Sequence, residues 1–493
     1  MPSRARTNRI TMEQGHSSTD SHPHHPLCCS VRLIYAICAF FSMIMHLCMR
    51  NAFNFTILCM VKHDVEPQIY TPNNSSLHPI EHPIYLYTTD GVETKQSSVS
   101  NVLWTRAQEI NIQATFYYGY VVTLPFAGRL ADKYGGKFFF IHSMTTQAIL
   151  FMLIPTFSRI SYVAAFIVRL LQGLVAGFGN PSIYQLFSTW AHQRERAALV
   201  AFGYGGYSVG ALIAFPLSAL LCRYNWELTF YIIGCIALIF GISCHWLVYN
   251  TLAAHPRLSA EEREYLQSTN DEKSKSHRIP WKDILTCVPV YAFILTHVLH
   301  SFGIMIFSLM LPRFLKEALG LSISESGIYS STPFLGGIIS KFIMVPTCAY
   351  IEKRPYYKRT LFSKLFYLFC TIFSIIFLTI VVLAGAEQVV IINLCILFVG
   401  FFTDMGFSSG YWTTLLHLTP SYAGLLSGIS NALSTINGFV SPVIIAALVT
   451  QGTKGEWNYV IFSLIVSYVL SAIIFTGFGS SKLQAWNKRS EDV

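Results

Sequence analysis

Apolar runs long enough to cross a membrane follow one another along most of the chain. An α-helix rises ~1.5 Å per residue, so about 20 apolar residues span the hydrocarbon core of a bilayer. The pattern predicts six such helices on each side of a polar stretch at 250–285. They lie near 33–60, 108–127, 138–157, 160–182, 198–222, 227–249, 287–311, 326–349, 361–384, 388–412, 421–448 and 457–478. We therefore predict an all-α, multi-pass membrane protein with twelve transmembrane helices in two six-helix halves.

The polar segments between these runs predict the domain organisation. We expect a disordered tail at 1–30, a first bundle at 31–249 with a long polar loop at 63–107, a linker at 250–285, a second bundle at 286–480 and a tail at 481–493. Within the linker, Ser259 and Glu262 have the spacing of a capping box, which predicts a linker helix.

The composition excludes several classes of protein. The chain is 53% hydrophobic and 12% charged, against a usual charged share of about 25%. A soluble protein of 493 residues could not cover its surface with so few charges. We expect no enzyme, catalytic residue, cofactor or metal site. The net charge of +9 does not imply a nucleic-acid partner, because membrane proteins gather Lys and Arg in their cytoplasmic loops.

The distribution of basic residues predicts the orientation. Most of the 34 Lys and Arg residues fall in the two tails and in alternate loops, which places both termini in the cytoplasm. The loop 63–107 is then outside, and Asn73 and Asn74 in it each begin a sequon for N-glycosylation. The plasma membrane, a vesicle and the lysosome all remain open as locations.

The segment "GRLADKYGGK", 128–137, joins the second and third predicted helices. Read alone, it is a charged turn in which glycines let the chain reverse tightly. With six helices on each side of the linker, it resembles the signature loop of the major facilitator superfamily, through Gly128, Asp132, Gly135 and Lys137 together with Leu130. The resemblance implies a conformational loop and a substrate site near the bilayer midplane, between the two halves.

A narrower resemblance rests on several separated motifs. The segments "NWELTFYIIG", "HPRLSAEEREYL", "IPWKDILTCVPVYA" and "TPSYAGLLSGISNALSTINGFVSPVI" are similar to the anion:cation symporter family. That family includes sodium–phosphate cotransporters, sialin and vesicular glutamate transporters. The resemblance implies a monomer in the lipid bilayer that carries a small anionic substrate, with a proton or sodium as the coupling ion.

Two arginines lie at membrane depth, Arg50 in the first helix and Arg169 in the fourth. Ionisable residues there usually face a wet cavity or a partner. The resemblance implies that both positions face the transport path and bind a substrate anion, which suits the planar guanidinium. Alternatively, each arginine caps a helix end or forms a structural pair. Tyr118 is a candidate polar neighbour, or a packing residue.

His297 and His300 are spaced i, i+3 and so share one side of the seventh helix. They are candidates for substrate binding, and a histidine can carry a coupled proton near neutral pH. The alternative is a pair of hydrogen-bonded core histidines. The resemblance matches His297 to a histidine of sialin-like members and His300 to an arginine of glutamate-transporting relatives.

The chain departs from the family where protons are coupled. Gln172 and Ala176 stand where sialin-like relatives carry glutamates, and His417 aligns with a family aspartate. We name His417 and Asp404 as coupling candidates, with Asp404 on one helical stripe with Ser408 and Tyr411. Asp404 can equally neutralise Lys341 as a structural pair, which is the preferred interpretation.

Together these features predict a secondary active transporter of small organic anions or phosphate. It would use a proton or sodium gradient and work by alternating access. A facilitator of a neutral or cationic solute, and a membrane sensor that transports nothing, are the alternatives.

Overall fold

The structure is a computed structural model that describes residues 30–62, 102–270, 279–352, 354 and 358–488. The predicted glycosylation sites Asn73 and Asn74 lie outside these residues.

The first half is a bundle of helices that begins directly after Ser30. A two-stranded parallel pair, β1 (Val61–Lys62) and β2 (Val102–Leu103), lies between its first two helices. Its helices are α1 (Val31–Met60), α2 (Arg106–Tyr134), α3 (Gly136–Ile160), α4 (Tyr162–Ala176), α5 (Gly179–Trp190), α6 (Gln193–Cys222) and α7 (Trp226–Leu247). Helices α4 and α5 together make one membrane span.

The second half repeats this arrangement after a linker that contains η1 (Leu252–Ala254), α8 (Ala260–Asn270) and α9 (Trp281–Thr286). A π-helical turn, η3 (Gly406–Tyr411), interrupts its fourth span. Its other elements are α10 (Val288–Glu317), α11 (Ile323–Ser330), α12 (Thr332–Glu352), α13 (Arg359–Leu383), α14 (Val389–Met405), α15 (Trp412–Leu418), η4 (Pro420–Tyr422), α16 (Ala423–Thr435), α17 (Asn437–Leu448), α18 (Lys454–Phe478) and α19 (Ala485–Lys488).

The predicted fold class is confirmed. Among the described residues, eleven helical spans are long and apolar enough to cross a membrane. The remaining predicted helix is α2, whose 29 residues extend for ~43 Å. Its charged ends, which include Arg106, Glu109 and Asp132, make it less apolar than the others.

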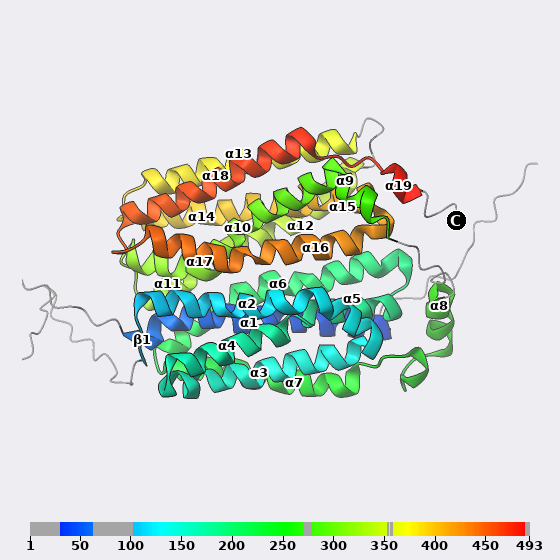
Figure 1. The fold of residues 1–493 in the computed structure, drawn as a ribbon, viewed down its shortest axis with the longest axis horizontal. Helices are drawn as coiled ribbons and strands as arrows, with labels where there is room; N and C mark the ends of the chain where they lie inside the picture. The colour runs from blue at the N-terminus through cyan, green and yellow to red at the C-terminus, as the bar shows by residue number, and fades with distance from the viewer. Residues whose placement is uncertain (1–29, 63–101, 271–278, 353, 355–357, 489–493) are drawn as a thin grey trace, which may run out of the picture.

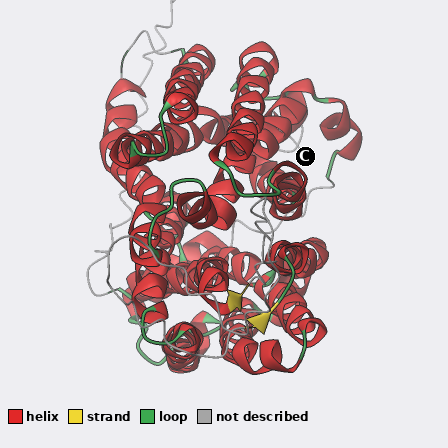
Figure 2. Cartoon of the chain, turned by 90° about the vertical axis from the view of Figure 1, so that its left-hand side faces the viewer, coloured by secondary structure: helices red, strands yellow, loops and turns green. Residues whose placement is uncertain are grey.

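The two halves lie side by side with their helices along the longest axis of the molecule (Figure 1). One end carries β1, and the other carries α8 and α19. Figure 2 shows the halves as two groups of helices, with the two strands in the lower group. The two ends are the β1 end and the α8 end of the molecule.

The same close contact between two helices, made through glycines, occurs in both halves. Gly119 of α2 and Gly173 of α4 lie against each other's backbone, where a Cβ atom would clash. Gly336 of α12 and Gly400 of α14 repeat this contact in the second half. Small residues of this kind let membrane helices approach closely. The repeat places α4 and α14, which carry Arg169 and Asp404, in equivalent positions.

The predicted capping box in the linker is half correct. Ser259 Oγ accepts a hydrogen bond from the Glu262 N–H (3.1 Å), as predicted. The Glu262 carboxylate instead accepts from the backbone N–H groups of Val31 and Arg32, at 3.2 and 3.3 Å. It therefore satisfies the first turn of α1, whose amides have no partner within that helix. The linker helix is fixed to the first half by this contact.

Candidate functional site

Arg50 lies inside α1, about 15 Å from the end of that helix at Met60. It is 9% exposed and donates a hydrogen bond to the Tyr207 hydroxyl of α6. Its guanidinium carbon is 5.2 Å from the centroid of the Tyr207 ring and 5.8 Å from that of Tyr117. Arg50 is thus held by aromatic rings and a phenol.

Arg169 lies in α4 and is fully buried. Its Nη1 donates to Gln172 Oε1 at 2.6 Å, and its guanidinium carbon is 3.8 Å from the centroid of the Phe53 ring. Its Nε and Nη2 atoms have no hydrogen-bond partner among the described residues. The neutral amide of Gln172 accepts the bond from Nη1 and leaves the charge of Arg169 in place.

The structure brings the two arginines into one environment. Phe53 lies one turn from Arg50 in α1, and Arg169 also lies 5.2 Å from the centroid of the Phe116 ring, next to Tyr117. Within the described part of the chain, neither arginine forms an ion pair. An uncompensated charge taken out of water costs several kcal/mol. Cation–π contacts of about 2 kcal/mol offset part of this cost and leave the positive charge available to an anion.

The predicted neighbour Tyr118 lies elsewhere. Its ring is 5.5 Å from that of Phe439 in the second half, and its hydroxyl donates to Asn111 Oδ1 at 3.5 Å. One residue turns an α-helix by about 100°, so Tyr117 takes the place beside Arg50. Sequence reasoning missed Tyr117 and Tyr207, because "FYYGY" does not indicate which tyrosine faces α1.

The two histidines of α10 lie in a separate aromatic cluster in the second half. His297 Nδ1 is 2.8 Å from the Tyr411 hydroxyl, and its Nε2 is 3.2 Å from Asn431 Oδ1. His300 Nδ1 is 3.4 Å from the Tyr367 hydroxyl. The contacts of His297 match the alternative of a hydrogen-bonded core histidine. Neither histidine joins the two arginines in this structure.

Asp404 and Lys341 form the pair that the preferred interpretation anticipated. Lys341 Nζ is 2.8 Å from Asp404 Oδ1, and Ser340 Oγ donates to Asp404 Oδ2 at 2.9 Å. Lys341 also donates to Ser208 Oγ of α6, at 2.9 Å. The predicted stripe of Asp404, Ser408 and Tyr411 is wrong in detail, because η3 has π-helical rather than α-helical spacing there.

The other coupling candidate, His417, lies in the last turn of α15. Its Nδ1 is 2.8 Å from Arg359 Nη1 at the start of α13. It belongs to the end of its span, and the structure does not bring it to Arg50, Arg169 or Asp404.

Only part of the motif at 128–137 forms a turn. Gly128 and Asp132 lie in α2, which continues to Tyr134. Gly135 makes the turn with φ = 91°, which favours glycine, and Asn250 accepts a hydrogen bond from the Lys137 N–H at 2.9 Å. A Cβ atom on Gly135 would lie 2.7 Å from the Asn250 amide nitrogen. The α2–α3 turn is thereby locked to the chain that follows α7.

Polar contacts join the two halves at the β1 end. Buried Arg313 of α10 forms an ion pair with buried Glu109 of α2, and Arg106 Nη2 is 3.0 Å from Glu317 Oε2. Asn54 Nδ2 donates to the Ser308 carbonyl at 3.2 Å. The helix predicted at 287–311 ends too early, because α10 continues to Glu317 and includes Arg313. These contacts close the β1 end.

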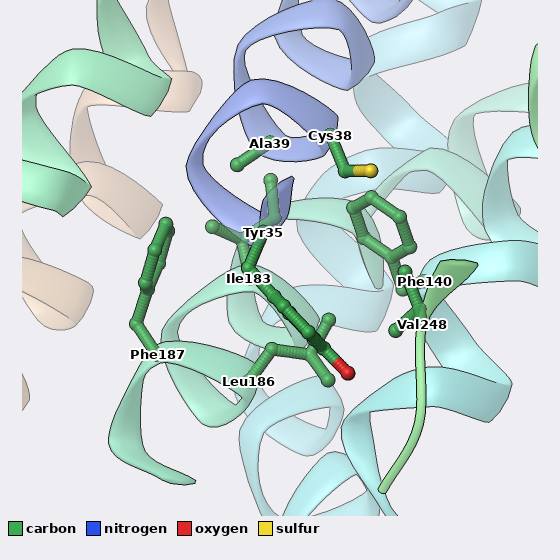
Figure 3. Close-up of a pocket in the computed structure, with 8 residues that line it drawn as sticks. All are labelled: Tyr35, Cys38, Ala39, Phe140, Ile183, Leu186, Phe187 and Val248. Atoms are coloured by element: carbon green, nitrogen blue, oxygen red, sulfur yellow. The ribbon is translucent and has the colours of Figure 1, made fainter. Parts of the chain in front are cut away.

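A narrow cavity at the α8 end does not resemble an anion site (Figure 3). Tyr35, Cys38 and Phe140 line it together with apolar residues of α1 and α5. It carries no charged side chain, so it offers nothing to a carboxylate or phosphate.

The comparisons with known proteins agree with this architecture. Residues 33–442 match the family model described as Major Facilitator Superfamily. The chain belongs to the major facilitator superfamily, a family of membrane transporters and not of enzymes. Sialin of Homo sapiens is 29% identical over 492 residues, with 97% of each chain covered. Vesicular glutamate transporter 1 of Bos taurus is 32% identical over 391 residues, with 77% of this chain and 69% of that protein covered.

A solved structure shows the same fold. The crystal structure of a D-xylose–proton symporter matches with a TM-score of 0.67 at 14% identity, covering 92% of this chain and all of the other. At this identity the likeness concerns the fold alone.

Proposed function

We propose that this protein is a secondary active transporter of small organic anions or phosphate, and that Arg50 and Arg169 bind the anion. The observation that carries this proposal is the pair of buried guanidinium groups without a carboxylate partner among the described residues. Tyr117 and Tyr207 supply the surrounding hydroxyls. The similarity to a vesicular glutamate transporter of Bos taurus supports a carboxylate as one class of substrate.

Alternating access fits the distribution of contacts. With the β1 end closed by Glu109 and Arg313, we propose that substrate reaches Arg50 from the α8 end in this state, and that rocking of the halves opens the β1 end. We place the α8 end in the cytoplasm, with a proton or sodium as the coupling ion. We propose that the protein works as a monomer.

Substrate charge separates this proposal from a facilitator of cationic solutes. Two uncompensated positive charges near the path repel a cation in a site of low dielectric. A sensor that transports nothing would bind an anion at these arginines without moving it.

The test is uptake by the purified protein in liposomes, with L-glutamate, N-acetylneuraminate and inorganic phosphate as labelled probes. We expect at least one anion to enter under an imposed pH or sodium gradient, and unlabelled anions to compete with it. Uptake of a cation or a neutral sugar in place of every anion would contradict the proposal. So would the absence of all uptake by protein shown to be folded and inserted.

The orientation has its own test. We expect Asn73 or Asn74 to carry a glycan when the chain is made in a glycosylating host, with a tag at either terminus facing the cytosol. Removal of the glycan by an endoglycosidase should increase electrophoretic mobility, and the variant with both residues changed to Gln should not shift. A glycan-free protein with tags accessible from outside would reverse the orientation. Fractionation of the same cells shows whether the protein resides in the plasma membrane, in a vesicle or in the lysosome.

We propose that the turn at Gly135, together with Gly128, Asp132 and Lys137, governs switching and not binding. Gly135→Ala forces a strained φ and pushes against Asn250, so we expect a slower transport rate with unchanged thermal stabilisation by ligand. Gly455→Ala is the matched control, because open space surrounds that glycine. Loss of ligand stabilisation in Gly135→Ala would place the turn in the binding site instead.

A further inference from the structure

Asp404 is unusual among the acidic residues of the described chain. The other described acids of the membrane-length helices, such as Glu109, Asp132 and Glu227, lie within about one turn of a helix end. Asp404 lies near the middle of the span Val389–Leu418. Among the described residues, the Lys and Arg side chains that lie well inside the membrane spans are those of Arg50, Arg169 and Lys341. One carboxylate among three basic side chains leaves a positive balance that one incoming anion reduces.

Asp404 and Lys341 approach each other because the helices that carry them pack closely. Gly337 of α12 faces Asp404, and a Cβ atom there would lie 3.3 Å from the Cβ and Cγ atoms of Asp404. The chain then enters η3, and π-helical turns within α-helices are frequent at functional sites. The Asp404 carboxylate therefore lies where α12, α14 and η3 meet.

The pair remains accessible and reaches the other half of the molecule. The side chain of Lys341 is 35% exposed and that of Asp404 is 22% exposed, unlike the closed pair of Arg313 and Glu109 at 2% and 1%. Lys341 also donates to Ser208 of α6. Ser208 directly follows Tyr207, the hydroxyl partner of Arg50. Lys341 thus connects Asp404 to α6, the helix whose Tyr207 hydroxyl accepts a hydrogen bond from Arg50.

We propose that Lys341 and Asp404 form an exchangeable ion pair that couples anion transport to a proton. The arriving anion accepts the hydrogen bond of Lys341 Nζ in place of Asp404. Asp404, now without its cation, takes one proton from water on the loading side, because an unpaired carboxylate at mid-membrane depth is more stable when neutral. On release of the anion, Lys341 returns to Asp404 and the proton leaves to water on the other side. One monovalent anion and one proton move together without net charge.

The other groups that face Asp404 do not compete for this proton. Ser340 of α12 and Ser208 of α6 do not titrate. Tyr411 of η3 interacts electrostatically with Asp404, and Tyr367 and Cys370 of α13 pack against neighbouring Gly406. Phenols and thiols of this kind are neutral at physiological pH. Under this proposal, Asp404 is ionised while Lys341 lies beside it and is protonated when Lys341 binds the anion.

This inference rests on the proposed transport of an anion, and the experiment separates the two. The protein in liposomes receives a gradient of one pH unit, with the anion identified in the uptake screen as the probe. One proton per monovalent anion allows about tenfold accumulation, since one pH unit equals a tenfold ratio. Absence of uptake by the parent overturns the proposed function and the coupling with it. Uptake that does not respond to the pH gradient overturns the coupling alone.

Variants of Asp404 and Lys341 test whether this pair couples the anion to the proton. We expect Asp404→Asn to show no accumulation under the pH gradient while it still exchanges labelled for unlabelled anion. Because that variant leaves Lys341 without its partner, the double variant Asp404→Asn with Lys341→Gln removes both charges together and protects folding. We expect the same loss of accumulation, with anion exchange weaker than in Asp404→Asn because Lys341 also contacts the anion. Accumulation by either folded variant as high as that of the parent overturns the proposal.

A matched control guards against a general effect of removing a carboxylate. Glu227→Gln breaks the ion pair with Arg159 within the first half, far from Asp404. We expect this variant to keep the tenfold accumulation. An equal loss in Glu227→Gln would mean that any broken ion pair reduces coupling, which contradicts a specific role for Asp404.

Discussion

Arg50→Gln is expected to abolish most anion binding, whereas Arg50→Lys retains weak binding. Lysine keeps the positive charge and loses the planar fork, and glutamine loses both. Removing one partner of a desolvated charge pair costs about 2–5 kcal/mol, which is about 30-fold or more in affinity. Ligand-induced thermal stabilisation of purified, folded variants measures the change.

Two further variants test whether the loss of binding is specific to the guanidinium of Arg50. Arg159→Gln is the matched control, because that arginine is 50% exposed and pairs with Glu227 within the first half. Its anion affinity should equal that of the parent. Tyr207→Phe removes the hydroxyl that accepts from Arg50 and keeps the ring, so we expect a smaller loss than for Arg50→Gln. If folded Arg50→Gln binds the anion as tightly as the parent, Arg50 is not the anion site.

The sequence was sufficient for the order and approximate ends of the helices, because hydrophobic length alone determines a membrane span. The span predicted at 198–222, for example, ends at Cys222 in α6. It also identified Arg50 and Arg169, since permanent charge within an apolar run is conspicuous. It could not show that Arg50 lies over the ring of Tyr117 and Arg169 over that of adjacent Phe116, because that depends on how α1, α2 and α4 are rotated.

The remaining differences have equally local causes. Tyr118 and Tyr117 are adjacent in the chain, and only the rotation of α2 distinguishes them. The π-helical turn at Gly406–Tyr411 changes which residues share a face with Asp404, and its sequence contains no clear signal for that turn. Arg313 lies beyond the helix predicted at 287–311, because charged residues usually mark the end of a span. In the structure, Glu109 neutralises it from the other half, a contact between residues far apart in sequence.

That contact leads to the second large effect. Arg313→Gln leaves Glu109 buried without its guanidinium, and breaking a buried pair at one partner costs about 3–5 kcal/mol. We expect a lower melting temperature and a β1 end that opens more often. The double variant Arg313→Gln with Glu109→Gln removes both charges, so its melting temperature should recover most of the loss. Its β1 end should still open more often, because the buried ion pair between the halves is gone.

Native cysteines report this opening. Cys59 of α1 and Cys222 of α6 pack at the β1 end against a cluster that includes Phe55 and, from the second half, Phe334. Separation of the halves exposes both thiols to a membrane-impermeant maleimide. We expect labelling at a temperature well below melting to be at least about tenfold faster in the double variant, which corresponds to 1.4 kcal/mol. Changing Cys59 and Cys222 to Ser identifies their share of the signal. Recovery of stability with labelling no faster than in the parent would mean that the Glu109–Arg313 pair stabilises the fold without controlling access.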